Sequence, residues 1–205
     1  MNSRYVIPFF TFLLFALPFQ LSAQFAINGS ARQDTGDCFV LTPNQDWQSG
    51  SVWYLNRVNI GSPFDLQFEI FLGCNDGGAD GIAFVLQQVS TNVGSQGGGL
   101  GYAGIQPSLA VEFDTWQNTG ERDPAYDHIA IQRNGFTRHA GVNNLAGPVG
   151  ILPGNTNAED CMYHKIRITW NPTTQTMMVY VDCNLRLSYT GNIIANTFGN
   201  NANVF

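Results

Sequence analysis

The feature that most constrains the fold is a repeated alternation of apolar and polar residues with a period of two. From Phe64 to Leu72, apolar side chains occupy positions 64, 66, 68 and 70, which is the pattern of an amphipathic strand. Similar short segments follow at 82–86, 109–114, 128–132, 165–170 and 176–181. Turn-forming residues separate them, and no stretch longer than about ten residues has a helical period with caps. The asparagine-rich region 141–157 is expected to be a long loop. The pattern predicts two packed antiparallel sheets in an all-β domain.

The composition points to the same class of fold and limits the partners. Only 12% of the residues are charged, while the chain has 22 glycines and 13% aromatic residues, which argues against helix bundles and coiled coils. The 15 acidic residues outnumber the 9 basic ones, and Lys165 is the only lysine. Nucleic-acid binding requires a basic surface that this chain lacks, so we expect no nucleic-acid partner. A neutral polar surface suits neutral, hydroxyl-rich ligands instead.

The amino terminus has the features of a signal peptide. Arg4 precedes an apolar run at 5–19 that is short for a membrane span and contains two prolines. Ala23 supplies a small residue at the expected cleavage site. We therefore predict a signal peptide at 1–23 and one domain from Gln24 to Phe205, secreted or at the cell surface and not inserted in the membrane. An uncleaved anchor is the alternative.

Four cysteines would meet an oxidising compartment after export, and an even number there is read most simply as two disulfides. The segments before and after the turn at 171–174 are expected to form a hairpin, which brings Cys161 close to Cys183. We therefore predict a Cys161–Cys183 bridge, leaving Cys38 to pair with Cys74. A zinc site is the competing interpretation, but the spacings contain no Cys-x-x-Cys.

An acidic cluster between two expected strands is the most informative motif. Glu112 and Asp114 are two residues apart on a strand, so both carboxylates project from the same face. Asn118 and Asp123 lie in the following loop, and His128 begins the next strand, so the loop can fold these groups back onto the carboxylates. Hard oxygen ligands at such spacing suit calcium, and an added imidazole suits a second ion such as manganese. Solvated acids on an outward face are the alternative.

With these motifs in place, the sequence resembles the legume-type (L-type) lectins, and specifically their bacterial secreted relatives. The resemblance extends over nearly all of the chain after the signal peptide, and its motifs lie at 79–86, 112–118, 123–124, 128–131 and 164–170. It implies a concanavalin A-like β-sandwich, or jelly roll, and a glycan as partner. Compared with the family, the chain ends early at Phe205, so we expect a domain truncated at its carboxyl end.

The resemblance also implies two ion sites. Calcium (Ca2+) would be held by Asp114, the carbonyl of Trp116, Asn118 and Asp123. A manganese-type ion (Mn2+ or another transition metal) would be held by Glu112, Asp114, Asp123 and His128.

The resemblance also implies a shallow sugar site, formed by the residues of this sequence that match the sugar-binding positions of the family. Asp80 would accept hydrogen bonds from two adjacent sugar hydroxyls, and the Ala79–Asp80 peptide would be cis. Gly98 would donate a backbone N–H, Asn118 would donate its amide, and Trp116 would stack on the apolar side of a pyranose.

Other histidines and tryptophans are expected to have no role in this site. We interpret His139 and His164 as surface or structural residues. We expect Trp47, Trp53 and Trp170 to lie in the core.

Two other classes of function compete with a lectin. Glu112 and Asp114 resemble the start of the acidic motif of laminarinase-like glycoside hydrolases, but the second glutamate that hydrolysis requires falls at Trp116 or Gln117. We therefore expect no enzyme activity. A structural adhesion module that binds protein is the other alternative. Either kind of domain is compatible with an oligomer.

Overall fold

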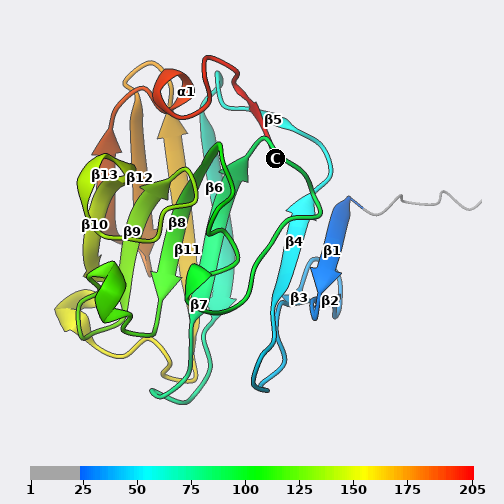
Figure 1. Ribbon diagram of the computed structural model, residues 1–205, viewed down its shortest axis with the longest axis vertical. Helices are drawn as coiled ribbons and strands as arrows, with labels where there is room; N and C mark the ends of the chain where they lie inside the picture. The colour runs from blue at the N-terminus through cyan, green and yellow to red at the C-terminus, as the bar shows by residue number, and fades with distance from the viewer. Residues whose placement is uncertain (1–23) are drawn as a thin grey trace, which may run out of the picture.

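The computed structural model describes residues 24–205 as a sandwich of two four-stranded antiparallel sheets (Figure 1). The front sheet has the strand order β10-β9-β8-β7, and the back sheet has the order β13-β12-β11-β6. The front-sheet strands are β7 (Gly81–Gln87), β8 (Ser108–Asp114), β9 (His128–Arg133) and β10 (Asn144–Gly150). The back-sheet strands are β6 (Phe64–Phe71), β11 (Tyr163–Asn171), β12 (Thr176–Val181) and β13 (Asn184–Thr190). The predicted signal peptide lies outside the described residues.

Short strand pairs, one short α-helix and four 3-10 helices complete the described part of the domain. The pairs are β1 with β4, β2 with β3, and β5 with β14. Their bounds are β1 (Phe25–Gly29), β2 (Arg32–Gln33), β3 (Phe39–Val40), β4 (Gly50–Tyr54), β5 (Val58–Asn59) and β14 (Asn203–Val204), and the helix is α1 (Ile193–Asn196). Within residues 24–205, no helix has both the length and the apolar character that a membrane crossing requires.

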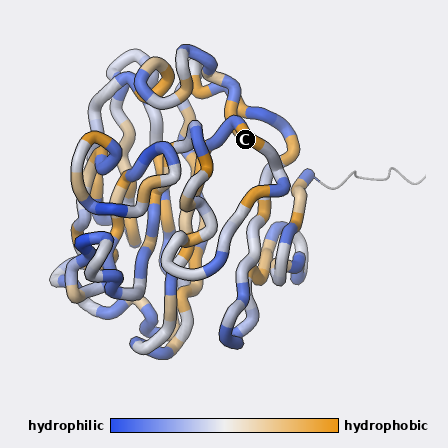
Figure 2. Tube along the Cα trace, viewed as in Figure 1, coloured by the Kyte–Doolittle hydropathy of each residue, from blue (hydrophilic) through white to orange (hydrophobic). Residues whose placement is uncertain are grey.

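Period-two alternation explains how the two sheets form one core. Along β11, buried and exposed residues alternate, and the buried residues Ile166, Ile168 and Trp170 pack in the main core. Figure 2 shows hydrophobic residues mainly along the strands and hydrophilic residues mainly in the loops between them. All six segments that the alternation predicts are strands, which confirms the antiparallel sandwich.

The front sheet differs from the back sheet because it is covered on both faces. All seven residues of β8 are buried. Val111 and Phe113 face the main core, whereas Ala110 packs in a second apolar cluster with Leu100 and Tyr102. The loop between β7 and β8 therefore lies over the outer face of β8. Polar side chains on this face are removed from water.

Two expectations about single segments are wrong. The region 141–157, expected to be a long loop, contains β10, which extends the front sheet beside β9. Trp47, expected in the core, is 89% exposed, whereas Trp53 and Trp170 are buried as predicted. The residue type alone does not predict whether an aromatic side chain in an irregular segment is buried or exposed.

The predicted disulfide pairing is also wrong, because the bridge joins Cys74 to Cys161. Strand β11 pairs with β6 as well as with β12, and Tyr163 lies opposite Phe71, so the chain before β11 meets the chain after β6. The Cys161 N–H donates to the Gly73 carbonyl at 3.0 Å. Cys38 and Cys183 are free and exposed.

The hairpin between β12 and β13 explains why Cys183 is unavailable to Cys161. Asp182 and Cys183 occupy its two-residue turn, and both have positive φ, 47° and 66°. Cys183 is thus at the tip of the turn, while Cys161 is held on the opposite side of β11 beside β6.

We predict that removing the Cys74–Cys161 bridge destabilises the domain. The bridge spans a sequence separation of 87 residues. Closing a long loop stabilises a fold by restricting the unfolded chain, typically by about 2–4 kcal/mol. Replacing both cysteines with serine should lower the free energy of unfolding by that amount in urea denaturation. The control Cys183→Ser removes only an exposed thiol and should leave stability unchanged. Equal losses in both variants would contradict the assigned pairing.

His164 on β11 is buried against two aspartates, so of the two predicted alternatives, surface or structural, the structural one is confirmed. Its Nδ1 lies 2.8 Å from Asp182 Oδ2, and its Nε2 lies 3.2 Å from Asp160 Oδ1. Burial acts to lower the pKa of His164, but the hydrogen bond and charge of Asp182 and the charge of Asp160 outweigh it and raise the pKa above 6.5. This ion pair fastens the start of β11 to the β12–β13 turn.

We predict a dependence of stability on pH that originates at His164. Since the pKa is raised on folding, the charged imidazole stabilises the fold fully below pH 6.5, and this contribution is lost as pH rises through the folded-state pKa. The wild type should therefore lose stability between about pH 6 and pH 8, and the His164→Gln variant should lose less over the same range. Urea denaturation of both proteins across this range measures the effect. Parallel curves would show that His164 contributes nothing to the slope.

Candidate functional site

Strand register gathers the candidate site on the outer face of the front sheet. Asp114, the last residue of β8, lies opposite Gly81 on β7 and opposite His128 on β9. The Thr115 N–H donates to the Asp80 carbonyl at 3.0 Å, which continues the pairing beyond the strand ends. The start of β7, the end of β8 and the start of β9 therefore meet at one place.

The loop after β8 folds back toward the strand through backbone N–H groups and carboxylates. The Trp116 N–H donates to Asp114 Oδ1 at 2.8 Å, and the Asn118 N–H donates to Asp123 Oδ2 at 2.6 Å. The side-chain oxygen Oδ1 of Asn118 is buried without a hydrogen-bond partner. The loop thus presents carboxylate and amide oxygens in one region.

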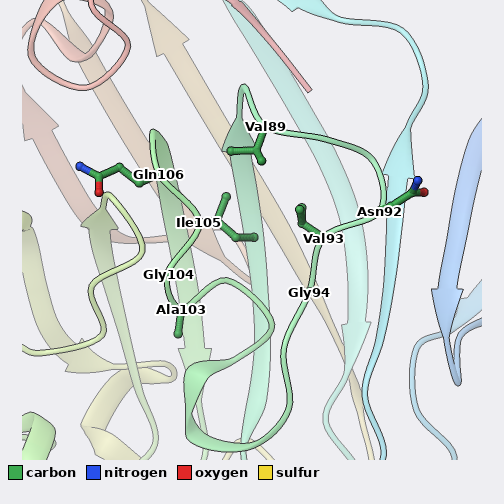
Figure 3. A pocket seen from close by; sticks show the side chains of 8 residues that line it. All are labelled: Val89, Asn92, Val93, Gly94, Ala103, Gly104, Ile105 and Gln106. Carbon is green, nitrogen blue, oxygen red and sulfur yellow. The ribbon is translucent and has the colours of Figure 1, made fainter.

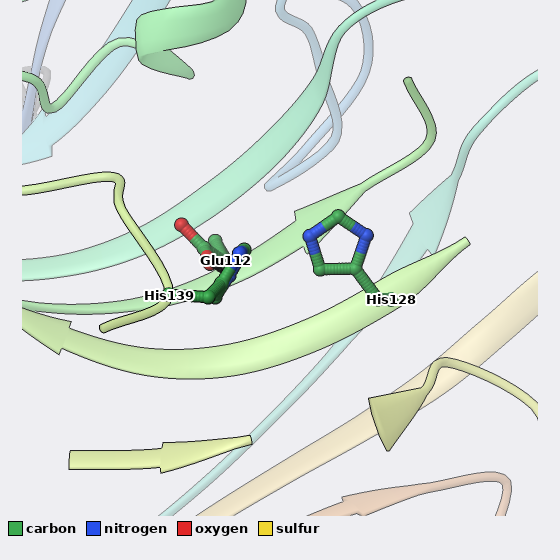
Figure 4. Close-up of side chains that lie close together, drawn as sticks. All are labelled: Glu112, His128 and His139. Carbon is green, nitrogen blue, oxygen red and sulfur yellow. Dashed lines mark hydrogen bonds and ion pairs between the residues drawn. The ribbon is translucent and has the colours of Figure 1, made fainter. Parts of the chain in front are cut away.

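Glu112 is buried at the centre of this face and is engaged at both oxygens. The Tyr102 hydroxyl donates to Glu112 Oε2 and also lies 3.0 Å from the Phe136 carbonyl oxygen. His139 Nε2 lies 2.5 Å from Glu112 Oε1. Figure 4 shows Glu112 and His139 against each other, with the ring of His128 beside them.

His139 is a member of the site that sequence reasoning missed. Its side chain is 1% exposed, and its Nδ1 lies 3.0 Å from Asp123 Oδ1. The imidazole therefore bridges Glu112 and Asp123, and of the two predicted alternatives, surface or structural, the surface one is excluded. Burial acts to lower the pKa of His139, but the contacts with Glu112 and Asp123 outweigh it and raise the pKa.

His128 is held in the form that binds metal ions. Its Nδ1 lies 3.3 Å from the Tyr126 carbonyl oxygen, which makes Nδ1 the protonated nitrogen. Its Nε2 is buried without a hydrogen-bond partner, 3.8 Å from Asp114 Oδ2 and 3.9 Å from Asp123 Oδ1. Burial, and then the charge of His139, lower the pKa of His128 to about 4, so the imidazole is neutral and offers a lone pair.

The carboxylates carry the electrostatic signature of a cation site. Burial first, and the nearby charges of Asp123 and Glu112, raise the pKa of Asp114 to about 8. Burial also raises the pKa of Asp123. Ligand atoms of Asp114, Asp123 and His128 lie within 4.8 Å of one another. Together with the unpartnered oxygen of Asn118, this set of carboxylate, amide and imidazole donors is of the kind that binds divalent metal ions.

The residues expected to bind sugar lie beside this cluster. Asn118 packs against Gly98 so closely that a Cβ on Gly98 would be 2.8 Å from Asn118 Oδ1. Trp116 is 45% exposed. The Ala79–Asp80 peptide is cis, as the resemblance implies. Gly81 must be glycine, because its φ is 129° and a Cβ would lie 2.2 Å from the Phe113 carbonyl oxygen.

Two hollows lie near the front-sheet loops. One, of about 380 Å³, is bordered by Val89, Val93 and Ile105 and has no titratable side chain in its lining, so it does not correspond to the candidate site (Figure 3). The other, of about 410 Å³, includes Trp116 and Asp76 in its lining. It adjoins the expected sugar residues through Trp116.

Comparison with known proteins identifies the family. The sequence profile described as legume lectin beta-barrel domain matches residues 18–205. The chain belongs to the legume-type lectin family. This lectin domain is 34% identical over 112 residues to a pesticidal crystal protein of Bacillus thuringiensis, and 45% identical over 64 residues to lectin-4 of Griffonia simplicifolia. These matches include 53% and 27% of this chain, and only 16% and 26% of the relatives, so the chain spans a minor part of their length.

Solved structures of lectins share the fold of this domain. The metal-free form of lectin I-B4 from Griffonia simplicifolia superposes with a TM-score of 0.71 at 22% identity, over 91% of this chain and 84% of that chain. Peanut lectin superposes with a TM-score of 0.71 at 21% identity, over 90% of this chain and 82% of that chain. The concanavalin A-like sandwich is therefore confirmed.

We predict that the Tyr102 hydroxyl stabilises the lectin domain by holding Glu112. Tyr102→Phe leaves a buried carboxylate oxygen without its donor, which should cost about 1.5–3 kcal/mol of unfolding free energy. Urea denaturation in the presence of a chelator isolates this effect from ion binding. Tyr189→Phe is the control, because no hydrogen bond of the Tyr189 hydroxyl is found within residues 24–205. A loss no larger than that of the control would contradict the assigned contact.

Proposed function

We propose that this lectin domain is a secreted or cell-surface module that binds a glycan through a shallow, calcium-organised site. The main support is the position of Asn118, whose buried Oδ1 has no partner and whose side chain touches Gly98. One residue thus joins the acidic loop to the expected sugar contacts. The family match supports the same class of ligand.

The ligands proposed for each ion follow from the cluster of carboxylates. Asp114, the Trp116 carbonyl, Asn118 and Asp123 would hold calcium, and Glu112, Asp114, Asp123 and His128 would hold a manganese-type ion. Bound calcium supplies a fixed positive charge that fastens the oxygen of Asn118 and so orients its amide N–H groups.

The proposed sugar contacts divide between polar and apolar groups. The Asp80 carboxylate accepts hydrogen bonds from two neighbouring hydroxyls, while Gly98 and Asn118 donate N–H groups. The exposed ring of Trp116 packs on the C–H face of a pyranose. A single site of this kind binds with about millimolar affinity, so strong adhesion depends on several sites acting together, in an oligomer or on a repeated glycan.

Glycoside hydrolysis is disfavoured by the environment of Glu112. Retaining hydrolysis requires two carboxyl groups free to flank one glycosidic bond. Glu112 is 1% exposed and is engaged by Tyr102 and His139. We therefore propose a binding domain without catalytic activity.

We predict that Asp80→Asn and Asp123→Ala fail in different ways. Asp123→Ala should abolish both calcium binding and sugar binding, because Asp123 also holds the Asn118 backbone. Asp80→Asn should keep calcium binding and weaken sugar binding by about 2 kcal/mol, roughly thirtyfold, because an amide accepts the two hydroxyl bonds less strongly. Calorimetry measures calcium, and a glycan array of multivalent probes measures sugar binding. Galactose and N-acetylgalactosamine are the first probes, because lectins of this fold have been solved with them.

Asp76→Asn is the matched control for the position of the sugar. Asp76 is an exposed carboxylate that lines the neighbouring hollow with Trp116, but it is not one of the proposed contacts. If Asp76→Asn loses sugar binding while Asp80→Asn retains it, the sugar occupies the hollow. Retention of calcium by Asp123→Ala would refute the metal assignment.

A further inference from the structure

The cluster on the front sheet contains one donor more than the proposed ion sites use. His139 comes from the loop after β9 and reaches the same carboxylates that would hold the transition ion. Its side chain is 1% exposed, and its two nitrogens face Glu112 Oε1 at 2.5 Å and Asp123 Oδ1 at 3.0 Å. The ring therefore lies among the ligands.

The backbone holds His139 in this position. The His139 N–H donates to the Glu121 carbonyl at 2.9 Å, which ties its loop to the loop that carries Asp123. The rings of His128 and His139 meet edge to face with centroids 4.7 Å apart. Two imidazoles from different segments thus lie beside Glu112 (Figure 4).

The spacing of the donor atoms suits a single ion. Ligand atoms of Glu112, His128 and His139 lie within 4.8 Å of one another. Donors bound at 2.0–2.2 Å on opposite sides of one ion are separated by about 4.2 Å. His128 Nε2 is buried and has no partner, so one donor already points into the cluster unsatisfied.

We propose that Glu112, His128 and His139 together bind zinc, cobalt or nickel in preference to manganese, a ligand set that uses His139 in place of Asp114 and Asp123. The inference rests on the metal-organised site proposed above. Imidazole donors suit zinc and nickel, whereas sites made of carboxylate and water suit manganese. Nδ1 faces Asp123 and can keep its proton there, which leaves Nε2, on the side of Glu112, as the metal-binding nitrogen.

The experiment counts imidazoles and compares ions in the protein saturated with calcium. X-ray absorption of the zinc complex of the wild type should report two imidazole ligands, and that of His139→Gln should report one. Titration calorimetry should show that His139→Gln lowers zinc affinity roughly tenfold to a hundredfold. Manganese affinity should change by less than about threefold, because the ligands proposed for manganese do not include His139.

His164→Gln is the matched control, because His164 is also buried against carboxylates but lies outside the cluster. It should leave both the imidazole count and the zinc affinity unchanged. One imidazole in the wild-type complex, or zinc binding by His139→Gln as tight as in the wild type, would overturn the proposal. The wild-type count decides the matter by itself if His139→Gln does not fold.

The two proposals fail in distinguishable ways. A zinc complex with one imidazole, together with intact calcium and sugar binding, removes only the role of His139. Absence of any divalent-ion binding in the wild type removes the metal-organised site and the role of His139 together.

Discussion

The burial of Glu112 and Asp114 on the outer face of β8 is the constraint on which the rest of this site depends. Both side chains are almost fully buried, in the middle of a sheet that is covered on both faces. A buried carboxylate is costly unless a donor or a positive charge compensates it. The donors that reach these two carboxylates, the Tyr102 hydroxyl, His139 and the Trp116 N–H, are therefore interpreted best as compensation for their burial. A bound metal ion would supply the remaining positive charge that these buried carboxylates need.

This compensation also connects the loops. The Trp116 N–H binds Asp114, the Asn118 N–H binds Asp123, and the side chain of Asn118 touches the glycine-rich loop at Gly98. A short series of contacts thus links the carboxylates at the centre of the sheet to the residues proposed to meet a sugar.

The strands could be predicted from the sequence because period-two alternation is a local property, and each strand follows it. The disulfide could not, because the hairpin argument considered only the neighbour of β11 that follows it in the chain. Strand β11 also pairs with β6, which is remote in sequence, and that neighbour carries Cys74 next to its end. The strand β10 was missed for a related reason. Register shifts and Pro148 interrupt the pairing of β10 with β9, so buried and exposed residues do not alternate along β10 as they do along β11.

The residues of the candidate site likewise fall into two groups, those close together in the sequence and those remote from them. The residues from Glu112 to His128 lie on one strand, its loop and the next strand, so a short stretch of sequence brings them together, and the structure places them as neighbours. Tyr102 and His139 come from loops on either side, and no spacing relates them to Glu112. Only the burial of Glu112 requires such partners. A buried carboxylate needs hydrogen-bond donors or positive charge near it, and tyrosine and histidine side chains elsewhere in the chain can supply them. This requirement is the signal by which Tyr102 and His139 could have been found.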